Sequence, residues 1–278
     1  MRSVTTEQTT SISAEQKAFY TEHGYLIARG MFSPDQVAAI RDTFEAIGSG
    51  PAIPPYWQPK DDPQRPGDPL TRYPRVMHPH RFNALARDML LHPGVGAALR
   101  QLLGAEPVAC QSMYYFKPPG ARGQAMHQDN FYLEVAPQTC IAAWTAIDPA
   151  TPENGGLYVV PGTHKLDIIC PDTADLKESF TTHLVHVPKG MKAVAAEMQP
   201  GDTLFFNGSV IHGSGPNRHK TLWRRSFICH YMPRESTQIS KWYFPILDFS
   251  GNEIPYPASV GGGPCGMEEK PTSYDRVH

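Results

Sequence analysis

Residues 200–231 read PGDTLFFNGSVIHGSGPNRHKTLWRRSFICHY, and this stretch decides the fold. It contains two apolar runs, 203–206 (TLFF) and 223–231 (WRRSFICHY), which are rich in the aromatic and β-branched residues that favour strands. Glycine and proline interrupt the sequence at 199–202 (QPGD) and 213–217 (GSGPN), where the backbone is expected to turn. The stretch therefore predicts two strands joined by a loop.

Similar short apolar runs, separated by turn residues, precede this stretch. They lie at 108–117, 139–147, 156–160, 183–187 and 192–197. Many short strands at such spacing are typical of a β-sandwich or barrel. The predicted fold class is therefore mainly β with N-terminal helices, a double-stranded β-helix (jelly roll) whose core covers about 105–235.

The segment from about 13 to 104 is predicted to be mostly helical. Ser13 and Ser33 are N-cap residues of two helices, and Gly48 is expected to end the second. The remaining segments are a frayed start at 1–12, a strand at 25–28, a long loop at 51–80, two helices within 82–103 and a weakly patterned tail at 236–278. We expect these parts to form one domain, 1–278.

Charge and composition exclude several classes of function. The 25 basic and 27 acidic residues give a net charge of −2, so no nucleic-acid or anionic-membrane partner is indicated. No stretch reaches the roughly 18 apolar residues of a membrane span. The first residues, MRSVTTEQTTSIS, contain no apolar segment, so no secretory signal is expected.

The five cysteines are odd in number and widely spaced, and they contain no CxxC pair. This pattern argues against a disulfide framework and against a cysteine zinc site, and it fits a reducing compartment. We therefore predict a cytoplasmic protein.

The sequence contains one His-x-Asp tripeptide, His127-Gln128-Asp129. On one strand, residues two apart point the same way, so this imidazole and carboxylate are predicted to coordinate one ion. The tripeptide alone is weak evidence, because a hydrogen-bonded surface pair is the commoner use of such residues. A second histidine, His212, lies at a predicted strand end beside glycines, where the backbone can approach a ligand closely.

Two histidines and one carboxylate with open coordination positions are typical of non-haem Fe(II) oxygenases. Arg224 follows on a predicted strand, and its planar guanidinium can bind a carboxylate through two hydrogen bonds. Three metal ligands near an arginine that can bind a carboxylate indicate a keto-acid cosubstrate that chelates the metal ion.

Two segments, 115–165 and 200–231, resemble the phytanoyl-CoA dioxygenase family. The resemblance rests on five ordered blocks: KPPG, HQD, ENGGL-x-VVPGTHK, PGD-x-x-FF, and HGSGPN followed by an arginine. Members are Fe(II)- and 2-oxoglutarate-dependent oxygenases on a double-stranded β-helix. The resemblance implies dioxygen as the second cosubstrate, succinate and CO2 as products, and hydroxylation of a C–H bond in a small molecule.

The resemblance also assigns roles to single residues. The iron ligands are His127, Asp129 and His212, and Arg224 with Ser214 binds the distal carboxylate of 2-oxoglutarate. The residues expected to line the cosubstrate pocket are Gln124, Tyr115 and Trp144. Counting back from Cys229-His230 favours Arg224 over its neighbour Arg225 as the clamp. In the related halogenases a small residue replaces the carboxylate ligand, so Asp129 predicts a hydroxylase.

Two alternatives to hydroxylation remain at this point. The same iron site supports desaturation, epimerisation or ring rearrangement, depending on where the substrate radical lies. A different class of protein is a binding module in which the metal only holds a jelly roll together. The sequence determines neither the substrate nor the oligomeric state.

Overall fold

The computed structural model describes residues 12–63, 65–137, 139–261 and 265. Its largest sheet is antiparallel and has the strand order β1-β10-β5-β12-β3-β13-β14, with β2 paired to β3. These strands are β1 (Tyr25–Ala28), β2 (Val76–Met77), β3 (Pro107–Tyr115), β5 (Ile141–Ala146), β10 (Thr203–Asn207), β12 (Ser226–Pro233), β13 (Ile246–Leu247) and β14 (Glu253–Ile254).

A second antiparallel sheet has the order β4-β11-β6-β9. Its strands are β4 (Gln124–His127), β6 (Leu157–Val159), β9 (Val194–Ala196) and β11 (His212–Ser214). A separate pair consists of β7 (Asp172–Thr173) and β8 (His183–Leu184). This architecture confirms the prediction of a mainly β jelly roll.

The helices are short, and most of them precede β3. They are α1 (Ala14–His23), α2 (Pro34–Ser49), α3 (Pro69–Arg72), α4 (Ala84–Leu90), α5 (Pro93–Leu103) and α6 (Asn130–Leu133), with 3-10 turns η1 (Pro79–Arg81), η2 (Thr163–Lys165) and η3 (Lys241–Tyr243). Ser13 and Ser33 both cap their helices as predicted, and each forms a capping box. Gly48 does not end α2, because the helix continues to Ser49. Gly48 is instead the place where the ring of Phe116 contacts the helix, and an added Cβ would lie 3.0 Å from that ring.

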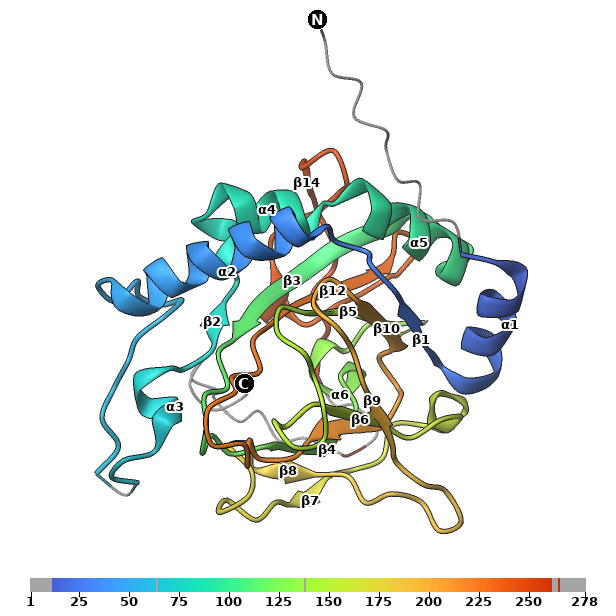
Figure 1. Ribbon diagram of the computed structural model, residues 1–278. Coiled ribbons are helices and arrows are strands. Elements are labelled where there is room, and N and C mark those ends of the chain that lie inside the picture. The colour runs from blue at the N-terminus through green and yellow to red at the C-terminus, as the bar shows by residue number, and fades with distance from the viewer. Residues whose placement is uncertain (1–11, 64, 138, 262–264, 266–278) are drawn as a thin grey trace, which may run out of the picture.

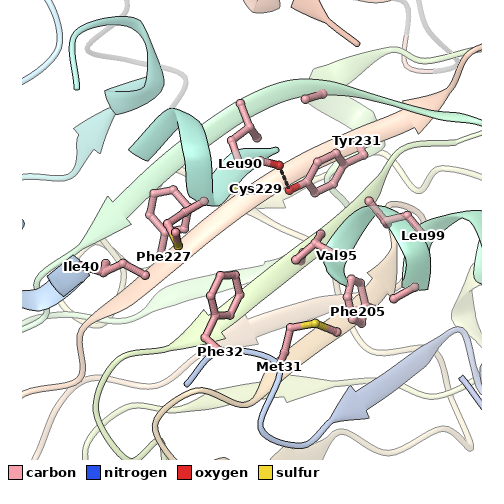
Figure 2. Close-up of a cluster of buried hydrophobic side chains, with 14 of the residues drawn as sticks. Met31, Phe32, Ile40, Leu90, Val95, Leu99, Phe205, Phe227, Cys229 and Tyr231 are labelled. Carbon is pink, nitrogen blue, oxygen red and sulfur yellow. Dashed lines mark hydrogen bonds between the residues drawn. The ribbon is translucent and has the colours of Figure 1, made fainter. Parts of the chain in front are cut away.

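The large sheet is buried on both faces, and successive residues of each strand serve different faces. Phe227, Cys229 and Tyr231 of β12 pack against the helices, whereas Ile228 points between the two sheets. Figure 1 shows α2, α4 and α5 across one side of this sheet, and the smaller sheet on the other. The contact with the helices is tied by a hydrogen bond of 2.7 Å from the Tyr231 hydroxyl to the carbonyl of Leu90 (Figure 2).

Phe44 of α2 is central to the packing of the helices on the large sheet. Its side chain is 1% exposed, and its ring is stacked on that of Tyr114 with centroids 3.9 Å apart. Phe44→Ala is expected to lower the free energy of unfolding by about 3–5 kcal/mol, since it leaves a cavity in a closed core. Denaturant unfolding measures this loss. Phe19→Ala is the control, because Phe19 is 40% exposed and its removal should cost much less.

The large sheet extends beyond the predicted core of about 105–235. β1 and β2 come from the N-terminal part, and β13 and β14 come from the tail that was expected to lack pattern. The loop predicted at 51–80 is interrupted by α3, β2 and η1. Of the frayed start predicted at 1–12, residues 1–11 lie outside the described residues, and Ile12 is buried in the core. Within those residues, no helix is long and apolar enough to cross a bilayer.

The prediction that the cysteines form no disulfide is wrong. Cys170 and Cys265 are bonded, with their Cα atoms 5.4 Å apart. Their sequence separation of 95 residues concealed the pair, because spacing alone carries no information on contacts made through the fold. The other three cysteines, Cys110, Cys140 and Cys229, are free and buried.

Candidate active site

The two histidines and the aspartate predicted as metal ligands lie together. His127 ends β4, His212 begins β11, and the two residues are direct partners in the register of these antiparallel strands. The Nε2 atoms of His127 and His212 lie 3.4 and 3.6 Å from Oδ1 of Asp129. One ligand atom from each residue falls within 4.8 Å of the others, and all three side chains are buried.

Asp129 reaches this point differently from the way that strand alternation predicts. It lies beyond the end of β4 and has helical backbone angles (φ −61°, ψ −37°), immediately before α6. Its carbonyl accepts the N–H groups of Tyr132 and Leu133, so the first turn of the helix fixes its backbone. His127 and Asp129 therefore converge although His127 ends a strand and Asp129 immediately precedes a helix.

Backbone carbonyls hold both imidazoles in one tautomer. Nδ1 of His127 donates to the carbonyl of Ala125 at 2.8 Å, and Nδ1 of His212 donates to that of Val210 at 3.0 Å. The lone pair of each Nε2 is therefore available toward Asp129. Burial lowers the pKa of His212 to about 4, so this ring is neutral at pH 7. Two neutral imidazoles and one carboxylate fit a divalent ion such as Fe(II).

A third imidazole, His230 of β12, binds the far side of the carboxylate. Its Nε2 donates to Oδ2 of Asp129 at 2.9 Å, which leaves Oδ1 toward the two histidine ligands. Burial by itself raises the pKa of Asp129. The surrounding imidazoles of His212 and His230 and the hydrogen bond that His230 donates outweigh burial, so the net pKa lies well below its usual value. The carboxylate is ionised and oriented.

We expect His230→Ala to weaken metal binding by about 10- to 100-fold, because an oriented ligand loses its outer hydrogen bond. His230→Gln, which keeps a donor, should lose less. Titration of the apoprotein with Fe(II) under anaerobic conditions measures the affinity. His186→Ala serves as the control, since that ring is exposed and pairs with Asp172 instead of Asp129. Equal affinity in His230→Ala and wild type would contradict the role given to His230.

A cavity opens beside the triad, between the two sheets. All five residues expected to contact the cosubstrate line it: Tyr115, Gln124, Trp144, Ser214 and Arg224. Further lining residues, which the sequence did not single out, are Met113, Tyr132, Leu133, Leu157, Phe206, Gly213 and Ile228. Strand alternation could have found some of them, because Met113 is two residues from Tyr115 on β3.

Arg224 enters this cavity from the residues just before β12, although it was predicted to lie on the strand. It is 2% exposed, its Nε donates to the carbonyl of Gly155 at 3.0 Å, and its Nη1 donates to Ser226 Oγ at 2.9 Å. Its guanidinium also lies 5.2 Å from the centroid of the Trp144 ring. Burial lowers its pKa to about 10. Within the described residues, no carboxylate oxygen comes within 4.0 Å of it.

Arg225 points the other way. It forms ion pairs with Asp148, at 2.7 Å, and with Glu45 of α2. Its charge is therefore neutralised inside the protein, whereas that of Arg224 is not. These two adjacent residues before β12 thus point to opposite sides, and Ile228 of β12 lies on the cavity side with Arg224.

Gln124 connects the triad to the mouth of the cavity. Its Nε2 donates to the Nε2 lone pair of His127 at 3.0 Å, and its Oε1 accepts from the Tyr115 hydroxyl at 3.4 Å. That hydroxyl accepts in turn from Arg75 at 3.2 Å. A metal ion held by the triad would need the same His127 lone pair and would therefore compete with the amide of Gln124 for it.

Solved structures share this architecture. The non-haem α-ketoglutarate-dependent carbocyclase SnoK from nogalamycin biosynthesis matches with a TM-score of 0.64 at 22% identity, over 82% of this chain and 86% of that one. EctD from S. alaskensis, solved with 2-oxoglutarate and 5-hydroxyectoine, also gives 0.64 at 22% identity, over 82% and 78%. These likenesses show the fold.

Sequence comparison is more specific. A probable phytanoyl-CoA dioxygenase from Caenorhabditis elegans is 30% identical over 244 residues, which cover 81% of this chain and 77% of that protein. The family profile of phytanoyl-CoA dioxygenase (PhyH) matches residues 20–226, a range that contains the triad, Ser214 and Arg224. The chain belongs to the phytanoyl-CoA dioxygenase family.

Proposed function

We propose that this protein is an Fe(II)- and 2-oxoglutarate-dependent dioxygenase that hydroxylates an unactivated C–H bond of a small molecule. The observation that carries the proposal is the shared cavity of the His127–Asp129–His212 triad and Arg224. Three converging ligand atoms provide a site for the ion. The buried guanidinium, which pairs with no carboxylate of the described residues, provides a site for an anion. A keto acid with a distal carboxylate satisfies both sites at once.

A ferrous ion held by the triad would supply the oxidising chemistry, in which R–H, 2-oxoglutarate and O2 become R–OH, succinate and CO2. The side chains do the rest. His127, His212 and Asp129 provide three ligand atoms and leave the other coordination positions to the cosubstrates. Arg224 and Ser214 fix the distal carboxylate and so orient the keto end toward the ion. Trp144 and the apolar lining residues exclude water.

Hydroxylation is the outcome that we propose, because the carboxylate of Asp129 occupies the position that a halide ligand would need. Neighbours with this fold include the carbocyclase SnoK and the epimerase SnoN, so desaturation, epimerisation and ring rearrangement are alternatives at the same site. The substrate radical decides among them, and product analysis by mass spectrometry distinguishes them.

The test begins without oxygen. Adding Fe(II) and then 2-oxoglutarate to the apoprotein should produce a weak visible metal-to-ligand absorption band. Admitting oxygen should then yield succinate, at a rate that rises when the true substrate is present in a screen of oxygen uptake. Absence of both the band and succinate would favour the alternative of a non-catalytic jelly roll held together by its metal.

The compartment is a separate matter. We propose a cytoplasmic location on the composition alone. The Cys170–Cys265 disulfide contradicts the argument for a reducing compartment that was based on the cysteine pattern. Fractionation of cells that express the native protein tests the location directly.

A further inference from the structure

Lys117 is a buried lysine that the proposed mechanism does not yet use. It follows β3 in the KPPG block and is 3% exposed. Its φ of 35° lies in a region of backbone conformation that residues other than glycine rarely adopt. Its carbonyl accepts both the backbone N–H of Arg224 and the side-chain amide of Asn217, each at 3.1 Å. The backbone of Lys117 is therefore tied directly to that of the cavity arginine.

The ammonium group of Lys117 lies among neutral atoms. Its Nζ donates to Ser214 Oγ at 2.8 Å, and within the described residues no carboxylate oxygen lies within 4.0 Å of it. Burial, and then the charge of Arg224, hold the pKa of Lys117 well below its usual value. A second cation buried near Arg224 is costly, because it loses hydration and is repelled by the guanidinium. An anion in the cavity removes much of that cost.

The bonding of Ser214 shows where its hydroxyl hydrogen points. Ser214 Oγ accepts from Lys117 Nζ at 2.8 Å and from the backbone N–H of Gln124 at 3.3 Å. A hydroxyl oxygen has two lone pairs, so with Lys117 protonated both are used, and the hydroxyl hydrogen is left to donate elsewhere. Ser214 lines the cavity together with Arg224. The acceptor for this hydrogen is therefore a group inside the cavity.

Gly155 makes room for this arrangement. A Cβ at Gly155 would lie 2.6 Å from Cε and 2.9 Å from Nζ of Lys117, and the residue has a φ of 78°. The carbonyl of the same glycine accepts from Arg224 Nε. One glycine thus holds the guanidinium with its carbonyl and leaves space for the ammonium beside its Cα.

We infer that Lys117 is a positioning residue for the distal carboxylate of the keto acid: it fixes the Ser214 hydroxyl as a donor into the cavity and shares with Arg224 the neutralisation of that carboxylate. This inference rests on the proposed function. It implies that Lys117 makes the protein bind dianionic keto acids more tightly than keto acids of equal length that lack the distal carboxylate.

The test compares 2-oxoglutarate with 2-oxopentanoate in the Fe(II)-loaded protein. Lys117→Met is expected to raise the Kd for 2-oxoglutarate by about 10- to 100-fold, the size expected for a buried charge-assisted hydrogen bond. The Kd for 2-oxopentanoate should change little, so that the discrimination between the two acids collapses. At saturating 2-oxoglutarate, kcat should fall much less than kcat/KM.

A double-mutant cycle with Ser214→Ala tests whether Lys117 acts through the serine. If it does, Lys117→Met should add little to the effect of Ser214→Ala, and the two effects should be far from additive. Fully additive effects would overturn the positioning role. Lys220→Met is the matched control, because Lys220 is exposed and should leave both Kd values unchanged. Lys117→Gln replaces Lys117→Met if the latter does not fold, as judged by its melting curve.

The two proposals fail in different ways. If wild type forms neither the visible band nor succinate, the proposed function is overturned. If wild type is active and the neutral Lys117 variants bind both keto acids with unchanged Kd values, only the role of Lys117 is overturned. An equal loss of affinity for both acids would also contradict it. That result would indicate a general structural defect and not a role specific to the distal carboxylate.

Discussion

Replacing Asp129 with alanine is expected to abolish succinate formation. The carboxylate is the one anionic group of the triad, and Oδ1 lies within 3.6 Å of both histidine Nε2 atoms. Its loss leaves two neutral imidazoles, so the protein no longer offsets the charge of the ion. We expect turnover to fall by more than about 100-fold, because even an outer hydrogen-bond partner of a ligand is worth roughly 10- to 100-fold.

Chromatographic assay of succinate, with iron content measured on the same sample, checks this prediction. Asp42→Ala is the control, because Asp42 is an exposed carboxylate on α2 and should keep both iron and activity. Melting curves of the two variants distinguish loss of the site from loss of the fold. Full turnover by Asp129→Ala with a normal iron content would refute the assignment of the triad.

Arg224→Met is expected to raise the KM for 2-oxoglutarate by about 100-fold or more. The guanidinium is fully buried and oriented by Gly155, Ser226 and Trp144, so a carboxylate bound there is desolvated and strongly held. Loss of one partner of such a pair is costly because the other charge stays buried. At saturating keto acid, kcat should fall less, since the ligands of the ion are intact.

The neighbouring arginine provides the control. Arg225→Met removes the ion pairs with Asp148 and Glu45, so it should lower the melting temperature and leave the KM for 2-oxoglutarate near that of wild type. Steady-state kinetics on both variants, varying only the keto acid, measure the difference. The opposite result, a raised KM in Arg225→Met alone, would reverse the assignment of the clamp.

The residues that the structure brings together at the cavity could be named from the sequence where their chemistry and their local spacing point to the same role. The two imidazoles and the carboxylate could be named because few residue types bind iron, and Arg224 because counting back from Cys229-His230 in the family resemblance favours it over Arg225. The His-x-Asp geometry was mistaken in its local structure: Asp129 is helical, and no short spacing distinguishes that from a strand.

Other features depend on contacts between distant segments, which a single sequence does not encode locally. The pairing of β13 with β3 joins residues more than a hundred positions apart, and so does the hydrogen bond from His230 to Asp129. Lys117 stood in a quoted block, yet its importance lies in a neighbour 97 residues away, Ser214. The Cys170–Cys265 bond has the same origin.

The two buried faces of β12 have a consequence for mutational scanning. If every substitution is made along 226–231, the phenotype should alternate with position. Changes at 227, 229 and 231 should mainly reduce thermal tolerance, whereas changes at 226, 228 and 230 should mainly alter turnover or cosubstrate preference. Substitutions intended to raise stability and substitutions intended to change selectivity would therefore be made at neighbouring positions of the same strand.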